Sequence, residues 1–174
     1  TFSMASLISV EVLRRTVTAV LVTPARVADF LAAKSIFGTG MALVQGVIVL
    51  ALLGAFTAQN WWLLALTVLL GSMMFTGVAM IVGAAGKDFL GQLFYAMVFT
   101  VPLIIPAASV LFPGTAATWV QAIPTYPVLA ALVDITIYDA QWAGVWHYFA
   151  FALAWVAVLF GAGLFTLKRK VESL

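Results

Sequence analysis

A stretch of 52 residues without one charged side chain, Ser35 to Gly86, constrains this 174-residue chain more than any other feature. A helix needs about 20 apolar residues to cross the hydrocarbon of a bilayer, so this stretch predicts two membrane spans and a turn. The turn falls at 57–60 and is followed by Trp61-Trp62, an indole pair suited to the headgroup boundary. The apolar runs are continuous instead of alternating, which argues against a β-barrel.

The composition excludes most other classes of protein. Apolar residues make up 65% of the chain and charged residues only 8%, whereas a soluble domain carries about 25% charged residues. So few charges cannot cover a surface in water, which excludes a soluble domain, a disordered segment and a nucleic-acid-binding module. The absence of cysteine excludes disulfide scaffolds, Cys-ligated zinc and thiol catalysis. The composition therefore indicates an integral membrane protein.

Prolines interrupt the second uncharged run, Phe89 to Val133. We expect a span at the start of this run, kinked near Pro102 and Pro106. An external connection, 112–143, with short re-entrant or interfacial helices is expected to follow it. The predicted fold is all-α: one polytopic membrane helical bundle, 1–174, with four complete spans after the end of an earlier one. The four spans are predicted at 35–56, 61–84, 89–111 and 146–167.

The basic residues predict the orientation. All eight fall in segments on one side of the predicted spans, and the connections on the other side contain neither Lys nor Arg. The positive-inside rule places that side in the cytoplasm, so both ends of this multi-pass chain are expected inside the inner (plasma) membrane. Residues 1–10 are apolar but too short to span, and we expect them to be the cytoplasmic end of an earlier span; a short interfacial segment is the alternative.

An amphipathic pattern precedes the first complete span. Apolar residues recur at helical spacing over 10–22 and place Glu11, Arg14 and Arg15 on the opposite face. Thr23-Pro24 ends this helix, because proline cannot continue it. Two interpretations fit the pattern equally: a helix on the lipid surface with its arginines toward anionic lipid, and a cytoplasmic helix whose polar face contacts a protein.

This segment resembles the cytoplasmic loop of ABC transporter permeases of the type-2 exporter class. Glu11 matches the acid that begins the loop, Thr16 matches its Gly-Thr pair, and Thr23-Pro24 matches its Leu-Val-Thr-Pro. The loop departs from the family at three positions, Val12, Leu13 and Arg15. The proline-broken connection before the last span and Lys168-Arg169-Lys170 after it are also similar to the family.

The resemblance implies partners and roles. Family members have six spans, so this chain would lack the first and most of the second. The segment 10–23 would be a coupling helix on a separate ABC ATPase subunit, which would bind ATP and Mg, and a second permease subunit, identical or different, would complete the transporter. Lipid would surround it, and this chain would bind no cofactor. The ATPase-coupling residues would be Glu11, Arg14, Arg15, Thr16, Thr23 and Pro24.

Few other residues suggest a site. Lys87-Asp88 is either a simple turn or a second, smaller contact for a cytoplasmic partner. The chain has no phosphate-binding loop and no hydrolase or metalloprotease motif, so we predict no catalytic or metal site. Some span aromatics suit the path of a hydrophobic or amphipathic substrate, although they would serve equally well against lipid: Phe94, Tyr95, Phe99, Phe149 and Phe151.

The missing charges bear on the source of free energy for transport. Ion-coupled carriers place ionisable residues inside the membrane, and none of the predicted spans has one at its centre. A transporter of this kind would take its free energy from an ATPase at the cytoplasmic face. Together with the resemblance, this makes the permease subunit of an ATP-driven exporter, not itself an enzyme, the leading hypothesis. A membrane anchor or scaffold subunit that transports nothing is the alternative.

Overall fold

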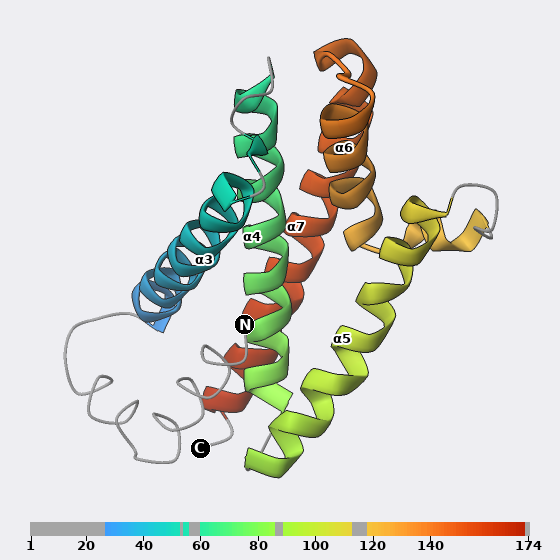
Figure 1. The fold of residues 1–174 in the computed structure, drawn as a ribbon. Helices are drawn as coiled ribbons and strands as arrows, with labels where there is room; N and C mark the ends of the chain where they lie inside the picture. The colour runs from blue at the N-terminus through green and yellow to red at the C-terminus, as the bar shows by residue number, and fades with distance from the viewer. Residues whose placement is uncertain (1–26, 53, 56–59, 86–88, 113–117, 173–174) are drawn as a thin grey trace.

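The computed structural model describes residues 27–52, 54–55, 60–85, 89–112 and 118–172, which form five α-helices and one short 3-10 helix (Figure 1). These ranges contain no strand, which confirms the all-α prediction. In chain order, the helices are α3 (Val27–Leu52), α4 (Trp61–Ala85), α5 (Phe89–Leu111), η2 (Thr118–Ala122), α6 (Thr125–Ile137) and α7 (Trp142–Glu172).

Four of these helices are long and apolar enough to cross a membrane, as predicted. The first, α3, ends at Leu52 and not at 56, because the chain turns at Gly54. The φ of Gly54 is 68°, a conformation that glycine adopts without steric cost, and its N–H donates to the Ala51 carbonyl at 3.0 Å. The expected end of an earlier span falls in 1–26, outside the described residues.

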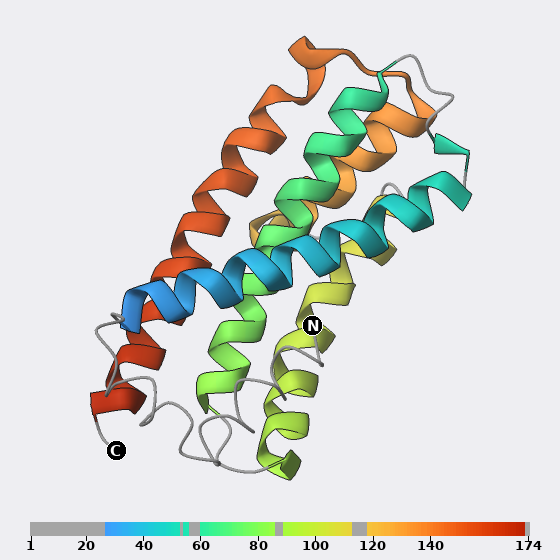
Figure 2. The same cartoon turned by 90° about the vertical axis from the view of Figure 1, so that its left-hand side faces the viewer.

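The helix α4 lies at the centre of the bundle (Figures 1 and 2). It contacts α3, α5, α6 and α7, and 61% of its apolar window is buried, against 22% or less for the other three spans. A helix that is apolar on all sides is stable in water only when it is buried, so the exposed sides of the outer helices are suited to lipid or to further protein. The main buried cluster joins α4 to α6 and α7 through Leu63, Leu64, Leu70, Met74, Ala131, Ile135, Val145, Phe149, Ala152 and Val156.

Glycines bring α4 and α7 into close contact. A Cβ atom added to Gly77 would lie 2.9 Å from the Cβ of Leu159, and one added to Gly163 would lie 3.1 Å from the Cβ of Met80. Backbone atoms of α7 also lie close to Gly77. Larger side chains at either position would push the two helices apart, which is the usual role of small residues between membrane helices.

The connection between α5 and α7 folds back against the spans. The helix α6 contacts α4, α5 and α7 and buries Thr125, Pro127 and Ile135. The helix ends in a turn at Asp139, whose φ is 51°, and the Ala140 N–H donates to the Asp134 carbonyl at 3.0 Å. The turn is so short that α7 begins at Trp142, earlier than the predicted 146.

The two ends of the bundle differ in their side chains. At the end where α4 and α7 begin, hereafter the tryptophan end, the rings of Trp62 and Trp142 stack with centroids 5.9 Å apart. Trp61 and Trp146 are also exposed there. At the opposite, basic end, α7 continues through Arg169, whose guanidinium lies 4.6 Å from the centroid of the Phe165 ring. Indoles at the headgroup level and basic residues on one side are both features of helix bundles that cross a bilayer.

Candidate functional site

The apolar windows of the four spans contain no Asp, Glu, Lys or Arg. The described residues also hold no group of three His, Asp or Glu side chains that could bind a metal ion. Apart from the imidazole of His147 near the start of α7, a site within these windows offers shape, apolar contact and neutral hydrogen-bonding groups.

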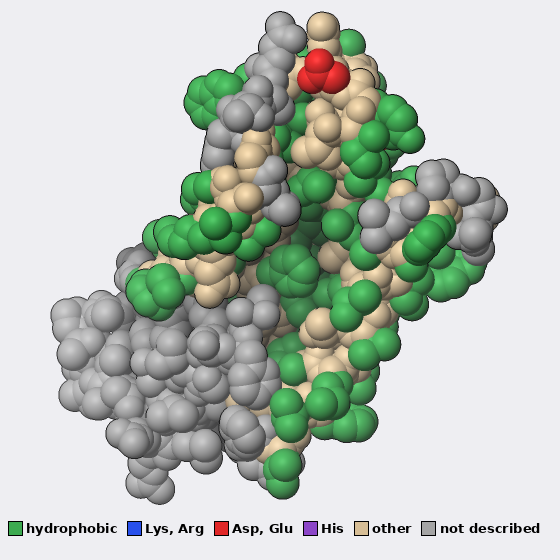
Figure 3. Space-filling view, viewed as in Figure 1, with side chains coloured by type: hydrophobic (Ala, Val, Ile, Leu, Met, Phe, Trp, Pro, Cys, Tyr) green, Lys and Arg blue, Asp and Glu red, His purple; other side chains and the backbone are tan. Residues whose placement is uncertain are grey.

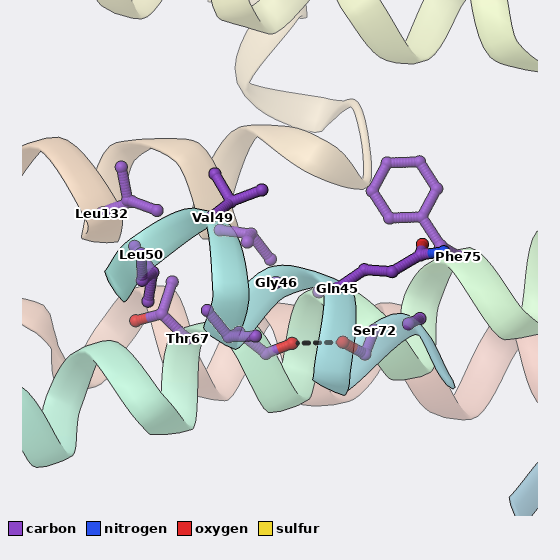
Figure 4. A pocket seen from close by; sticks show the side chains of 12 residues that line it. Gln45, Gly46, Val49, Leu50, Thr67, Ser72, Phe75 and Leu132 are labelled. Carbon is purple, nitrogen blue, oxygen red and sulfur yellow. Dashed lines mark hydrogen bonds between the residues drawn. The ribbon is translucent and has the colours of Figure 1, made fainter. Parts of the chain in front are cut away.

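A groove of about 420 Å³ opens between α3, α4 and α6 (Figure 4). The face of the molecule between α3 and α5 is hollowed, and its side chains are mostly hydrophobic (Figure 3). Twelve residues line the groove: Ala42, Gln45, Gly46, Val49, Leu50, Thr67, Val68, Gly71, Ser72, Phe75, Val128 and Leu132.

Two glycines of the lining explain why three helices meet there. The helix α3 crosses α4 obliquely (Figure 2), and a Cβ added to Gly46 would lie 2.6 Å from Cγ1 of Val68. On the other side, a Cβ added to Gly71 would lie 3.2 Å from Cγ1 of Val128 on α6. The helix α3 therefore approaches α4 through its own glycine, Gly46, and α6 approaches α4 at Gly71. The groove lies between α3 and α6.

The groove contains one polar side chain without a hydrogen-bond partner. The hydroxyls of Thr67 and Ser72 donate to carbonyls of their own helix, Leu63 at 2.8 Å and Val68 at 2.7 Å. Gln45 is exposed, and no hydrogen bond joins its side chain to the rest of the described structure. Figure 4 shows this side chain extending from α3 toward Phe75.

Gln45 gives the groove a chemical preference. An amide kept from water without a hydrogen bond costs about 1–3 kcal/mol, and a ligand that bonds to it recovers that free energy. Gln45 lies near the middle of the window Ser35–Leu52, where no headgroup would provide the bond. The groove therefore suits a mainly apolar molecule with one hydrogen-bonding group. The sequence signal that identifies Gln45 is simple, because it is the only amide in the first predicted span.

The five aromatic residues predicted to line a substrate path are not brought together. Phe94, Tyr95 and Phe99 lie on the exposed side of α5, where the rings of Phe94 and Tyr95 meet edge to face at 6.0 Å. Phe149 is buried and stacks on Trp142 at 5.5 Å. Phe151, on α7, borders a different cavity at the tryptophan end. None of the five lines the groove.

The predicted coupling residues lie outside the described residues. This applies to the whole segment 10–23, with Glu11, Arg14, Arg15, Thr16, Thr23 and Pro24, and to Lys87 and Asp88 in the connection between α4 and α5. Their roles stay predictions from the sequence.

One comparison with known proteins gives a result. A family model described as "ABC-2 family transporter protein" matches residues 1–165. No curated protein and no solved structure matches the chain. The family match covers all four spans up to Phe165, including the helices that form the groove.

Proposed function

The chain belongs to the ABC-2 family of transporter proteins, and from this membership we propose that it is the permease subunit of an ATP-driven ABC exporter. Proteins of this family are membrane components of transport and are not themselves catalytic. The family match over residues 1–165, on a bundle whose four apolar windows contain no Asp, Glu, Lys or Arg, carries the proposal.

The uncharged spans support an external source of free energy. Proton- or ion-driven carriers need ionisable or ion-binding groups within the membrane, and the apolar windows here have no charged side chain. ATP hydrolysis by an ABC ATPase subunit, which would hold ATP and Mg, supplies the free energy instead. The resemblance of residues 10–23 to a coupling loop supports contact with that subunit through Arg14 and Arg15, with Lys87-Asp88 as a second, smaller contact.

The distribution of side chains supports an orientation. The eight basic residues of the chain occur in segments at one end of the spans, and the exposed tryptophans gather at the other. By the positive-inside rule, the basic end is cytoplasmic and the tryptophan end faces outward from the inner membrane. In this orientation both proposed ATPase contacts, residues 10–23 and Lys87-Asp88, would be on the cytoplasmic side.

The groove supports a hydrophobic or amphipathic substrate. Its lining is largely aliphatic, with Phe75 as the aromatic member and Gln45 as the unpaired amide. Such a site favours a molecule with apolar bulk and a hydrogen-bonding group, and it offers nothing to a strongly hydrated ion. The largely exposed apolar faces of α3 and α5 are suited to a second permease subunit, identical or different.

Transport in inverted membrane vesicles tests the proposal. The vesicles contain this chain and the ATPase that copurifies with it in mild detergent, and uptake of a neutral fluorescent dye with one hydroxyl group is measured. We expect uptake with ATP and none with a hydrolysis-deficient ATPase. Gln45→Leu should weaken the apparent affinity for the hydroxyl dye by about tenfold, the loss of one hydrogen bond, and should leave a hydrocarbon dye unaffected.

Gln141→Leu is the matched control, because Gln141 is an exposed glutamine outside the groove. It should change neither dye. A folded complex that transports no dye and shows no substrate-stimulated hydrolysis would favour the anchor or scaffold. Uptake of a purely hydrophilic cargo alone would contradict the proposed substrate class.

A further inference from the structure

A second cavity, of about 550 Å³, lies at the tryptophan end where η2, α6 and α7 meet. It shares no lining residue with the groove. Hereafter it is called the end pocket, and its lining consists of Thr118, Gln121, Ala122, Tyr126, His147, Tyr148 and Phe151.

The end pocket has a different chemistry from the groove. None of its lining residues is Asp, Glu, Lys or Arg, so it has no fixed charge for an anion or an organic cation. Thr118, Gln121 and Tyr126 offer hydroxyl and amide groups that both donate and accept. The side chains of Thr118 and Gln121 make no hydrogen bond within the described part of the chain, so these groups are available to a ligand.

Aromatic rings form the other part of the end pocket. The rings of His147 and Tyr148 lie with centroids 4.0 Å apart, and Phe151 follows one turn along α7. Asp134 lies near Tyr148, and the Phe151 ring meets Trp155 edge to face at 6.5 Å. The rings therefore pack against neighbouring residues. This restricts their side chains before binding, so less side-chain freedom is lost when a ligand binds.

We propose that the end pocket binds the ring of a neutral sugar. A pyranose ring has an apolar C–H face, which stacks on aromatic rings, and hydroxyls that donate and accept hydrogen bonds, as Thr118, Gln121 and Tyr126 do. A carboxylate would favour a cation, but none is part of the lining. The proposal does not depend on ATP-driven transport, since it concerns binding to this chain alone.

The position of the end pocket allows two sources of the sugar. Trp146 precedes His147 and is 55% exposed, as expected for a residue of the headgroup belt. A ligand in the end pocket is therefore within reach of a glycolipid headgroup in the adjacent leaflet and of a free sugar in the water outside it.

Binding is tested on the full chain in phosphatidylcholine nanodiscs prepared without glycoside detergents. One arm titrates methyl glucoside and methyl galactoside, and the other compares nanodiscs with and without a monoglucosyl lipid; ligand contacts are followed by saturation-transfer NMR. Gln121→Leu and Tyr126→Phe should each weaken binding by about tenfold, the loss of one hydrogen bond. Gln141→Leu and Tyr138→Phe make the same chemical changes at exposed positions outside the pocket and should have no effect.

Each result decides the proposal. Pocket-specific binding of the soluble glycosides identifies a free-sugar site, and binding of the glucosyl lipid alone identifies a headgroup site; both support it. The proposal is overturned if neither sugar source binds, if choline binds in their place, or if pocket and control variants lose affinity equally. Tyr126→Phe retains the ring, and circular dichroism with size-exclusion chromatography shows whether each variant is folded, so a failure of Gln121→Leu to fold leaves the test intact.

Discussion

Single residues determine how closely the helices of this bundle approach. Gly77 faces the backbone of α7. A Cβ atom added to Gly77 would lie 3.3 Å from the carbonyl carbon of Leu159 and 3.4 Å from the backbone nitrogen of Phe160. By contrast, Gly161 lies on the same pair of helices but has nothing within 4 Å of its potential Cβ. The two glycines therefore separate the effect of packing from the effect of glycine itself.

Gly77→Ala should lower the free energy of unfolding by about 1–3 kcal/mol, since the new methyl group forces α4 and α7 apart. The measurement is the midpoint of denaturant-induced unfolding of the chain in detergent micelles. Gly161→Ala serves as the matched change and should be neutral or stabilising by up to about 1 kcal/mol, because alanine favours a helix over glycine. Equal effects of both substitutions would show that the close approach at Gly77 is unimportant.

At this scale the sequence predicts less than the structure shows. Small residues recur in the spans, and pairs such as Gly161 and Gly163 look equivalent in the sequence, yet of these two only Gly163 lies where an added Cβ would meet a neighbouring helix. Spacing along one helix does not reveal which side faces its neighbour when the helix is apolar on all sides. The amide of Gln45 could have been identified, but its groove could not, because it depends on three helices distant in sequence.

Among the elements, α6 is joined by a hydrogen bond to the part of α5 that contains its two prolines. Pro106 lacks the N–H that would donate to the carbonyl of Pro102, one turn earlier in α5. The hydroxyl of Thr125, at the start of α6, donates to the Leu103 carbonyl at 2.7 Å. The prolines were recognisable in the sequence as a break, but this partner, 22 residues further along, was not.

Thr125→Val should therefore destabilise the contact between α5 and α6. Valine has the shape of threonine without the hydroxyl, and the loss should be about 1 kcal/mol, with faster amide exchange over α6. Thr136→Val is the control on the same helix, because the Thr136 hydroxyl donates only to Leu132 within α6. Unchanged exchange in Thr125→Val, or equal acceleration in both variants, would argue against a role for this hydrogen bond.

For the whole molecule, the number of spans was predictable from the sequence. The way their faces pack, and therefore the position of the groove, was not. Uncharged runs separated by turns predict the number of spans directly, because the bilayer requires about 20 apolar residues for each. The same uniform hydrophobicity removes information about which faces meet, so the aromatic substrate path was drawn from residues that the structure separates, Phe149 in the core and Phe94 on the surface.

The proposed orientation can be measured in intact cells. A cysteine introduced at Gln59 should react with an impermeant maleimide added from outside, and one at Lys87 should react only after the membrane is permeabilised. The chain has no native cysteine, so the background is clean. The opposite labelling pattern would invert the proposed topology and place the tryptophan end in the cytoplasm.

Energy coupling is the property of the whole molecule that best separates an exporter from an anchor. If residues 10–23 transmit motion from an ATPase, replacing both Arg14 and Arg15 with glutamate should preserve insertion and weaken ATPase association. The reversal would place like charges together at the interface, at a cost of several kcal/mol where they are desolvated. We expect pull-down of the ATPase to fall and substrate-stimulated ATP hydrolysis to be lost.

The charge reversal also weakens attraction to anionic lipid and the positive-inside signal, and a second double variant separates these effects from coupling. Lys168→Glu with Arg169→Glu makes the same change in net charge near the basic end of α7, outside the predicted coupling segment. This control should retain association and stimulated hydrolysis, and the cysteine labelling at Gln59 verifies topology in both variants. The Arg14 and Arg15 variant could insert correctly and keep both ATPase association and stimulated hydrolysis. In that case the segment is a lipid-surface helix, and the ATPase must contact another part of the chain. If both double variants lose association equally, the basic residues act through the membrane surface and not through a contact with the ATPase.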